Sequence, residues 1–255
     1  MQPLISIITV VYNGERYLEQ TIASVLGQTY DNIEYLIIDG GSTDGTIDII
    51  KKYEQHLSGW VSEKDQGLYD AMNKGIARAK GELIGMINSD DWFEATAVET
   101  VVKEYRAFPD KKIFHGDRND ILNNGKARLK RFHPSNIKFK YLGMTYNHPS
   151  MFVHRELYAR GTYNIHLQAL SDYEFVLAHY LRNPELFRYI PVAYVNYRLD
   201  GISANMKLFR RIKEGYRARK NAGLNILENS FSALFRMTVF SAQGLMRRKE
   251  SKHEE

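Results

Sequence analysis

Two adjacent carboxylates, Asp90 and Asp91, end the stretch Asn-Ser-Asp-Asp (88–91), which directly follows the apolar run 83–87. The run predicts a buried strand, and groups at the carboxyl end of such a strand lie in the crevice where open α/β sheets bind ligands. Aspartate oxygens suit Mg²⁺ or Mn²⁺, and a cation held there could bind a diphosphate. The structural alternative is that either aspartate caps a helix beginning near Trp92.

The elements that must position these carboxylates alternate between strand and helix over the first hundred residues. Strand-like apolar runs are separated by turn signals and by segments with apolar residues at helical spacing. We expect strands at 4–11, 34–38, 60–61 and 83–87, and helices at 15–26, 46–53 and 68–79. This order predicts an α/β fold with a Rossmann-like, doubly wound, mostly parallel sheet and ligand groups at the strand ends.

Composition and glycine spacing exclude several classes of protein. The chain has no cysteine, so disulfides, thiolate metal sites and a cysteine nucleophile are excluded. The turn after the first strand carries only Asn13 and Gly14, which is neither the three-glycine fingerprint of a dinucleotide-binding fold nor a P-loop. The glycines cluster instead at 40–45, beside Asp39 and Asp44. This clustering favours a nucleotide held by carboxylates and a metal.

The net charge of +5 is unevenly distributed. Residues 205–255 contain 12 Lys and Arg against 5 Glu, which leaves the first 204 residues slightly acidic. The near-neutral body and the absence of zinc-finger or RNA-binding motifs predict no nucleic-acid partner. No apolar stretch is long enough to span a bilayer, and the first strand-like run follows no basic leader. We therefore expect a cytoplasmic location, with the inner face of the membrane as an option for the basic tail.

Four segments of the first hundred residues, taken together, resemble the family 2 inverting glycosyltransferases, which use the GT-A fold. The segments are 6–14, 38–46, 63–75 and 88–91. The later chain is similar more loosely, at 148–152 and 171–174. Within the family, the chain is most similar to members that build bacterial cell-surface polysaccharides. The resemblance implies transfer of a sugar from a nucleotide-diphosphate sugar, commonly UDP-linked, to a hydroxyl of a glycan or lipid-linked acceptor.

The resemblance also implies a Mn²⁺ or Mg²⁺ cofactor, which as a Lewis acid would stabilise the leaving diphosphate. Asp90 matches the metal-binding carboxylate of the family's Asp-x-Asp motif, with Asp91 as its neighbour. Asn88 stands where the family has the first aspartate, and an amide can hydrogen-bond a ribose or base but adds no charge. Asp91 could supply the missing carboxylate. Asn88 and Ser89 are assigned to nucleotide-sugar binding.

A nucleotide pocket follows from the same resemblance, with Asp39 accepting a hydrogen bond from the base. The residues lining the same space would be Thr9, Tyr12 and Asp65. Each has a structural alternative: Thr9 suits an ordinary strand, Tyr12 could serve packing, and both aspartates suit turns or loops.

Three further polar residues would contact the donor. Asn73 and Lys74 lie on an expected helix beside the pocket, although a solvated helix face explains Lys74 equally well. Arg198 lies in the segment 197–203, which is similar to the part that covers the donor diphosphate in the family, and it could contact phosphate. A structural arginine in a surface loop is the alternative.

An inverting transferase needs a base for the proton of the acceptor hydroxyl. Asp172 matches the family's base at the start of a later helix whose apolar face includes Tyr173 and Val176. The alternative is a capping box from Ser171 to Glu174, which would also fix Asp172 at the helix mouth. Glu174 would then be structural.

Two other polar positions and the carboxyl-terminal tail keep open interpretations. His148 could bind acceptor or metal but suits a structural turn, and Asp117 receives no role. Apolar residues recur at helical spacing from Phe231 to Met246, before the basic run 247–249. Such a helix can lie in a membrane interface or pack on protein. The polar end, 249–255, is expected to fray.

The sequence thus predicts a metal-dependent inverting glycosyltransferase. The GT-A domain would span 1–204, with a nucleotide-sugar part at about 1–95 and an acceptor part at about 96–204, followed by a basic helical extension at 205–255. A sugar-1-phosphate nucleotidyltransferase is the alternative enzyme, but it would need a basic, glycine-rich loop that residues 13–16 lack. A non-catalytic nucleotide-sugar-binding module is the other alternative.

Overall fold

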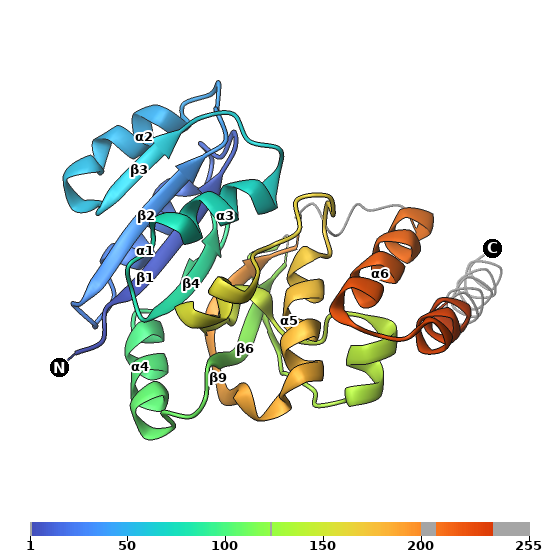
Figure 1. Ribbon diagram of the computed structural model, residues 1–255. Helices are drawn as coiled ribbons and strands as arrows, with labels where there is room; N and C mark the ends of the chain where they lie inside the picture. Colours follow the sequence, from blue (N-terminus) through green and yellow to red (C-terminus); the bar gives the residue numbers. More distant parts are fainter. Residues whose placement is uncertain (1, 123, 200–207, 237–255) are drawn as a thin grey trace, which may run out of the picture.

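A nine-stranded sheet organises the computed structural model, which describes residues 2–122, 124–199 and 208–236 (Figure 1). The strands are β1 (Ile5–Val11), β2 (Ile33–Asp39), β3 (Gly59–Ser62), β4 (Leu83–Asn88), β5 (Trp92–Phe93), β6 (Ile113–Ile121), β7 (Ala127–Lys130), β8 (Phe152–His154) and β9 (Phe187–Arg198). The α-helices are α1 (Leu18–Leu26), α2 (Thr46–Lys52), α3 (Leu68–Arg78), α4 (Ala97–Ala107), α5 (Ser171–Arg182) and α6 (Leu208–Ala222). Short helical turns lie at Glu54–His56, Lys138–Leu142, His148–Ser150, Arg155–Arg160 and Pro184–Leu186, and residues 226–236 are also helical.

The sheet order is β3-β2-β1-β4-β8-β6-β9-β5, with β7 paired to β6. Strands β3, β2, β1 and β4 are parallel, so their carboxyl ends share one edge. β1 is buried along its whole length, as the continuous apolar run of a parallel strand covered on both faces requires. Strand β8 joins this half antiparallel to β6, and β6 and β9 form the other long parallel ladder.

Two apolar cores lie on opposite faces of the sheet. One packs α3 and α5 against Ile8, Val10 and Ile38, and the other packs α1, α2 and α4 against Ile7 and Ile37 (Figure 1). Alternate residues of β1 face opposite cores because side chains alternate along a strand. The expected α/β class and doubly wound sheet are confirmed.

Two local expectations were wrong. No helix begins near Trp92, because Trp92 and Phe93 pair with Asn196 and Val195 of β9 and form strand β5. Helix α4 starts only at Ala97, so neither Asp90 nor Asp91 caps it. The first helix begins at Leu18, three residues later than expected.

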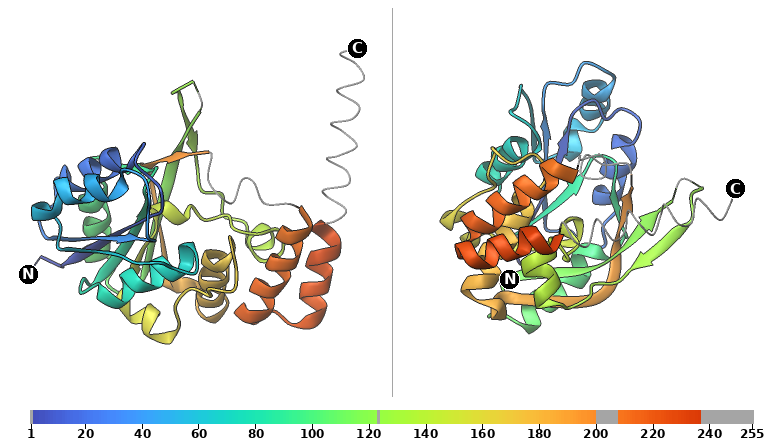
Figure 2. Two further views of the ribbon diagram at one scale, coloured as in Figure 1. Left: turned by 90° about the horizontal axis from the view of Figure 1, so that it is seen from above. Right: turned by 90° about the vertical axis from the view of Figure 1, so that its right-hand side faces the viewer.

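The carboxyl-terminal part of the described chain packs beside α5. Helix α6 contacts α5, and Figure 2 shows the helix at 226–236 lying alongside α6 at one end of the molecule. No helix in the described ranges is long and apolar enough to cross a membrane. The expected apolar positions from 239 to 246, the basic run 247–249, the fraying end and residues 200–203 lie outside the described residues. The domain boundaries at 95 and 204 stay predictions.

Candidate functional site

The carboxyl ends of the parallel strands bring polar side chains together at one edge of the sheet. Asp39 ends β2 and is paired with Val11 of β1 and Ser62 of β3. Asn88 ends β4 and is paired with Val10 of the same central strand. This is the crevice position where open α/β sheets place ligands.

Asp39 closes the turn that follows β2. Its Oδ2 accepts hydrogen bonds from the backbone N–H groups of Gly41 and Ser42, both 3.0 Å away, and from Ser62 Oγ at 2.6 Å. Its Oδ1 accepts one bond, from Ser42 Oγ at 2.5 Å. The carboxylate is fully buried, and Gly41 has a φ of +85° that suits glycine. These contacts give Asp39 the turn-forming role of the structural alternative, while Oδ1 keeps capacity for a second donor.

Asp65 lies directly against this turn. A Cβ on Gly40 would collide with its carboxylate, so glycine permits the close approach of the two segments. Asp65 Oδ1 also accepts the N–H of Gly67 at 2.8 Å. The structure therefore brings together Asp39 and Asp65, two of the residues expected to hold the nucleotide.

Asn88, Asp91 and Arg198 form one hydrogen-bonded group next to Asp90, in which Asp91 is buried and the other two residues are partly buried. Asp91 accepts the Asn88 side-chain amide at 3.0 Å and the Arg198 backbone N–H at 2.9 Å, one on each carboxylate oxygen. Its own carbonyl accepts Thr21 Oγ1 at 2.7 Å. Asp91 is 1% exposed. Burial, followed by the negative charge of Asp90, raises the pKa of Asp91 to about 8.

The Arg198 side chain holds the neighbouring backbone. Its guanidinium donates to the Asp90 carbonyl and, at 2.8 Å, to Gln20 Oε1. It also stacks over the rings of Tyr17 and Trp92, with 3.9 and 4.6 Å to their centroids. Arg198 thus fixes the Asp90 main chain from the end of β9.

Asp172 stands in the first turn of α5, partly exposed. Tyr69 OH donates to its Oδ1 at 3.0 Å, and the Tyr173 N–H donates to the same oxygen at 2.8 Å. Both bonds use Oδ1, so within the described part of the chain Oδ2 accepts no hydrogen bond. Burial and the Asp172 charge raise the pKa of Tyr69 well above its usual value, so this phenol stays a donor.

The expected capping box at this helix is wrong. Ser171 is already the first helical residue, and its Oγ accepts the N–H of Asn164 at 2.5 Å. Glu174 instead accepts the side-chain amides of Asn164 and Asn221. Its bonds tie α5 to α6, which fits the structural role expected for it.

A group of aromatic residues and His148 lies beside Asp172. His148 Nε2 and Tyr163 OH are 3.0 Å apart, and the rings of Tyr69 and Tyr163 are 5.6 Å apart. Burial lowers the pKa of His148, against the opposing pull of the Asp172 charge. Asn73 links α3 to this group: its amide donates to the Tyr163 carbonyl at 2.8 Å and accepts the Tyr163 N–H at 2.9 Å.

Other expected donor residues lie elsewhere or are engaged by protein. Thr9 is fully buried and pairs with Tyr35 OH at 3.0 Å inside the core that packs α1, α2 and α4. Tyr12 is exposed. Lys74 donates to the Lys64 carbonyl and pairs with Glu63 at 3.2 Å and Asp70 at 3.5 Å. Ser89 lies close to Gly14, in the loop after β1.

Asp117, which had no expected role, is a structural residue. It is buried, and its Oδ1 accepts the N–H of Phe132 at 2.7 Å and Tyr189 OH at 2.8 Å. The neighbouring His115 is buried among the rings of Phe132, Tyr146 and Tyr189.

Four residues of the candidate site were not predicted from the sequence. Tyr69, which orients Asp172, lies within the segment 63–75, but only its contact across 103 residues reveals the role. Tyr163 gives no sequence signal. Ser42 and Ser62 complete the turn around Asp39, and Ser42 lies within the segment 38–46.

Asp90 lies two residues after the end of β4, beside Asp91, and is the carboxylate that the sequence predicts as a cation ligand. Among the described residues, no three His, Cys, Asp or Glu side chains gather as a metal cage. Mg²⁺ commonly binds through one or two carboxylates together with substrate phosphates and water. Asp90 follows the end of β4, and its neighbour Asp91 accepts protein hydrogen bonds on both carboxylate oxygens. A cation bound by Asp90 together with a diphosphate would fit this arrangement.

The chain is similar to known glycosyltransferases. A family description, "Glycosyl transferase family 2", matches residues 6–161. A Bacillus subtilis glycosyltransferase, EpsH, is 38% identical over 103 residues, covering 40% of this chain and 30% of its own length. The B. subtilis teichuronic acid biosynthesis glycosyltransferase TuaG is 38% identical over 101 residues, covering 38% and 40%. An uncharacterized Mycobacterium tuberculosis glycosyltransferase is 32% identical over 185 residues, covering 69% and 68%.

Solved structures match the fold over most of the chain. Staphylococcus aureus TarS 1–349 in complex with UDP superposes with a TM-score of 0.68 at 17% identity, covering 92% of this chain and 70% of that one. The Pyrobaculum calidifontis mannosyltransferase PcManGT, in complex with GDP-Man and Mn²⁺, gives 0.66 at 14% identity, covering 100% and 81%. At these identities the likeness shows the fold alone.

Proposed function

This chain belongs to glycosyl transferase family 2, and we propose that it transfers a sugar, with inversion, from a UDP-sugar to a hydroxyl of a glycan or lipid-linked acceptor. The single observation that carries the proposal is the state of Asp172, whose Oδ1 accepts two hydrogen bonds while its Oδ2 accepts none from the residues that the structure describes. A carboxylate oriented through one oxygen can use the other as a general base.

The proposed reaction is a single displacement. Asp172 Oδ2 takes the proton of the acceptor hydroxyl as the hydroxyl oxygen attacks the anomeric carbon of the donor. The bond from that carbon to the diphosphate oxygen breaks, and its electron pair leaves with the nucleoside diphosphate. Attack opposite the leaving group inverts the anomeric configuration. Tyr69 keeps Asp172 in place, because its hydrogen bond fixes Oδ1.

Asp90 is the proposed protein ligand of Mn²⁺ or Mg²⁺, and Asp91 supports it. When bound, the cation would offset the negative charge of the departing diphosphate. The chain's own contribution is positioning: Arg198 holds the Asp90 carbonyl, and Asp91 holds the Arg198 and Asn88 groups around it. Both carboxylate oxygens of Asp91 accept protein hydrogen bonds, which supports a positioning role for Asp91 and the ligand role for Asp90.

The donor nucleotide would bind along the edge formed by Asp39 and Asp65, with Tyr12 and Ser89 on the neighbouring loops. TarS, which shares the fold and was solved in complex with UDP, supports a uridine nucleotide. The place of Asp39 and Asp65 at the carboxyl ends of parallel strands supports the position. TuaG, whose name refers to teichuronic acid biosynthesis, supports a place in polysaccharide biosynthesis. In this scheme residues 1–95 serve the donor, 96–204 the acceptor, and 205–255 form an extension.

Calorimetry with a panel of nucleoside diphosphates, with and without Mn²⁺, tests donor binding. UDP should bind best, and Mn²⁺ should strengthen its binding in wild type but not in Asp90→Asn. Failure of every nucleotide to bind would refute the proposal.

Donor turnover with and without acceptor tests the base. Asp172→Asn should lower kcat by about 10²–10⁴-fold and leave UDP affinity unchanged, because the base acts only in transfer. The control is Glu174→Gln, two positions along the same helix and bonded to Asn164 and Asn221, which should keep near-wild-type kcat. Equal losses in both variants would assign Asp172 a structural role instead.

A further inference from the structure

The last two described helices form a helical hairpin, defined here as residues 208–236. Helix α6 and the helix at 226–236 run side by side at the surface in both views of Figure 2. The second helix is inverted relative to an ordinary surface helix, because its polar side faces the protein. Asn229, Ser232 and Arg236 are buried, and Asn229 bonds Arg219 and the Tyr216 carbonyl.

The outward side of the helix at 226–236 is apolar. Leu227 is 82% exposed, Leu234 63% and Phe231 58%. At helical spacing these residues share one side with Ile226, Phe235 and the uncharged Ser230. A contiguous exposed apolar side of this kind marks an interaction surface. Packing on the catalytic domain through the apolar stripe, one expected alternative, does not occur at these positions, because the buried side chains Asn229, Ser232 and Arg236 are polar, while packing of the stripe on a second subunit stays untested.

The outward side of α6 is cationic. Its exposed charged residues are Arg210, Lys213, Arg217 and Lys220. Of the two acidic residues of the hairpin, Glu214 is buried and accepts the N–H groups of Gln168 and Ala169, and Glu228 is partly buried and accepts Tyr141 OH. The exposed charged side chains of α6 are therefore all cationic.

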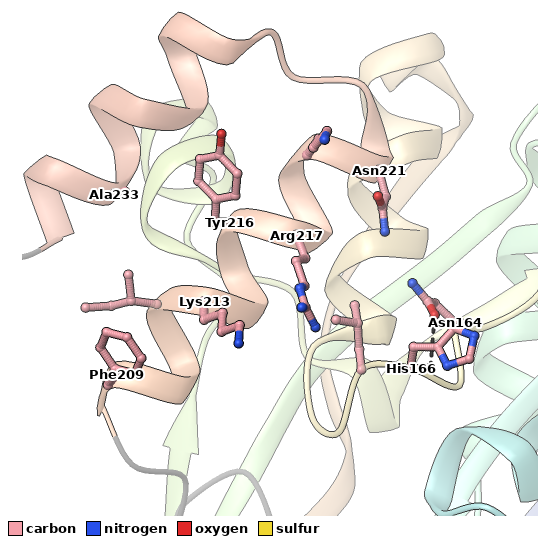
Figure 3. Close-up of a pocket in the computed structure, with 11 residues that line it drawn as sticks. Asn164, His166, Phe209, Lys213, Tyr216, Arg217, Asn221 and Ala233 are labelled. Carbon is pink, nitrogen blue, oxygen red and sulfur yellow. Dashed lines mark hydrogen bonds between the residues drawn. The ribbon is translucent and has the colours of Figure 1, made fainter.

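A groove of about 700 Å³ connects the two sides (Figure 3). Phe209, Ile212, Tyr216 and Ala233 line its apolar part. At its other end Figure 3 shows Lys213, Arg217 and Asn221 on the side of the loop that carries Asn164 and His166. The outer surface of the hairpin is thus continuous, with cationic side chains, a groove and an apolar stripe in sequence.

We propose that the outer surface of the helical hairpin docks on an anionic lipid bilayer. Apolar side chains enter the boundary between headgroups and acyl chains, while neighbouring Lys and Arg side chains pair with lipid phosphates. The charge pattern selects this occupant over a second copy of the chain. A second copy would bring the same net positive surface to the contact, and like charges would oppose association.

Vesicle flotation of the full chain tests this docking. Wild type should float with phosphatidylglycerol-containing vesicles and less with phosphatidylcholine vesicles. The variant Leu227→Gln/Phe231→Gln/Leu234→Gln should bind at least about tenfold more weakly, because it removes apolar insertion. The variant Lys213→Gln/Arg217→Gln/Lys220→Gln should weaken binding on the order of 100-fold at low salt, from about 1 kcal/mol for each charge.

The matched control is Leu129→Gln/Val192→Gln, which removes exposed apolar side chains from β7 and β9 and should bind like wild type. Inorganic diphosphate at constant ionic strength should not release the protein, because a small anion cannot replace apolar insertion. Its release would assign the groove to a soluble phosphate ligand and overturn the proposal. So would absence of wild-type binding, or unchanged binding by the apolar variant. Sedimentation supplies the last outcome: a dimer that only the apolar variant dissociates, without vesicle binding, would assign the surface to a second copy.

Discussion

Asn73 offers the sharpest test of how the site is built, because two roles make opposite predictions for it. As a donor-binding residue, it would affect nucleotide affinity and leave stability unchanged. In the structure its side chain instead makes both hydrogen bonds to the backbone of Tyr163, at 2.8 and 2.9 Å. These two hydrogen bonds, called the Asn73 clamp below, join α3 to the segment that carries Tyr163, the hydrogen-bond partner of His148. We therefore expect stability to respond first.

The magnitude follows from the two bonds. Asn73→Ala removes both and leaves a partly buried N–H and carbonyl without partners, which costs about 2–4 kcal/mol of unfolding free energy. Asn73→Asp keeps the acceptor for the N–H but faces the Tyr163 carbonyl with a carboxylate. Only the protonated carboxyl can donate to that carbonyl. A lost bond worth about 2.7 kcal/mol corresponds to a folded-state pKa raised by about 2 units, from about 4 to about 6.

The pH dependence gives the variant its own signature. Because the folded pKa of the introduced carboxyl is raised, its contribution is complete below pH about 4 and is lost as pH rises through about 6. Urea denaturation should show Asn73→Asp about 1.4 kcal/mol less stable than wild type at pH 5 and about 2.6 kcal/mol less stable at pH 6.5. Asn73→Ala should show a constant deficit. If Asn73→Ala kept full stability but raised KM for the donor, the clamp would be refuted and the donor-contact role restored.

Two further substitutions probe the packing around the site. His115→Phe should reduce the loss of stability in acid, because burial lowers the pKa of His115 to about 3. Below pH 6.5 the unfolding free energy of wild type should fall by about 1.4 kcal/mol per pH unit, or roughly 2 kcal/mol by pH 5. Urea denaturation should show that the Phe variant retains that amount. Equal acid sensitivity would show that His115 accepts a proton in the folded protein. Gly75→Ala should cost about 1–3 kcal/mol in thermal unfolding, because its Cβ would stand 2.5 Å from Ile8 Cγ2, and an unchanged Tm would mean that α3 can move aside freely.

The sequence could predict the strand ends, because continuous apolar runs and turn residues are local signals. The runs at 4–11, 34–38 and 83–87 became β1, β2 and β4, and their parallel pairing placed Asp39 and Asn88 at one edge. The fold class followed from that pattern, and the family followed from the resemblance of the segments 6–14, 38–46, 63–75 and 88–91. The contacts of Asp39 could be expected only as a turn, since Ser62 reaches it from another strand.

The sequence could not predict contacts between distant segments. Trp92 looked like a helix start, but pairing with Asn196 made it a strand. Ser171 and Glu174 had capping-box spacing, yet Asn164 and Asn221 bind them instead. In each case a partner distant in sequence satisfied the polar group that local chemistry would otherwise have used.

Helix α3 contacts both parts of the proposed site, and this constrains how the protein family can evolve. One side of the helix carries Tyr69 and Asn73 toward Asp172 and Tyr163, and an adjacent side carries Lys74 toward Glu63 and Lys64, next to Asp65. The two halves of the proposed site are therefore positioned by the same eleven-residue helix, α3. Related proteins can change their donor loops and their acceptor loops independently, provided that the sequence of helix α3 is retained. Its residues should accordingly change more slowly than those around them, and transplanted loops should work best between proteins that share it.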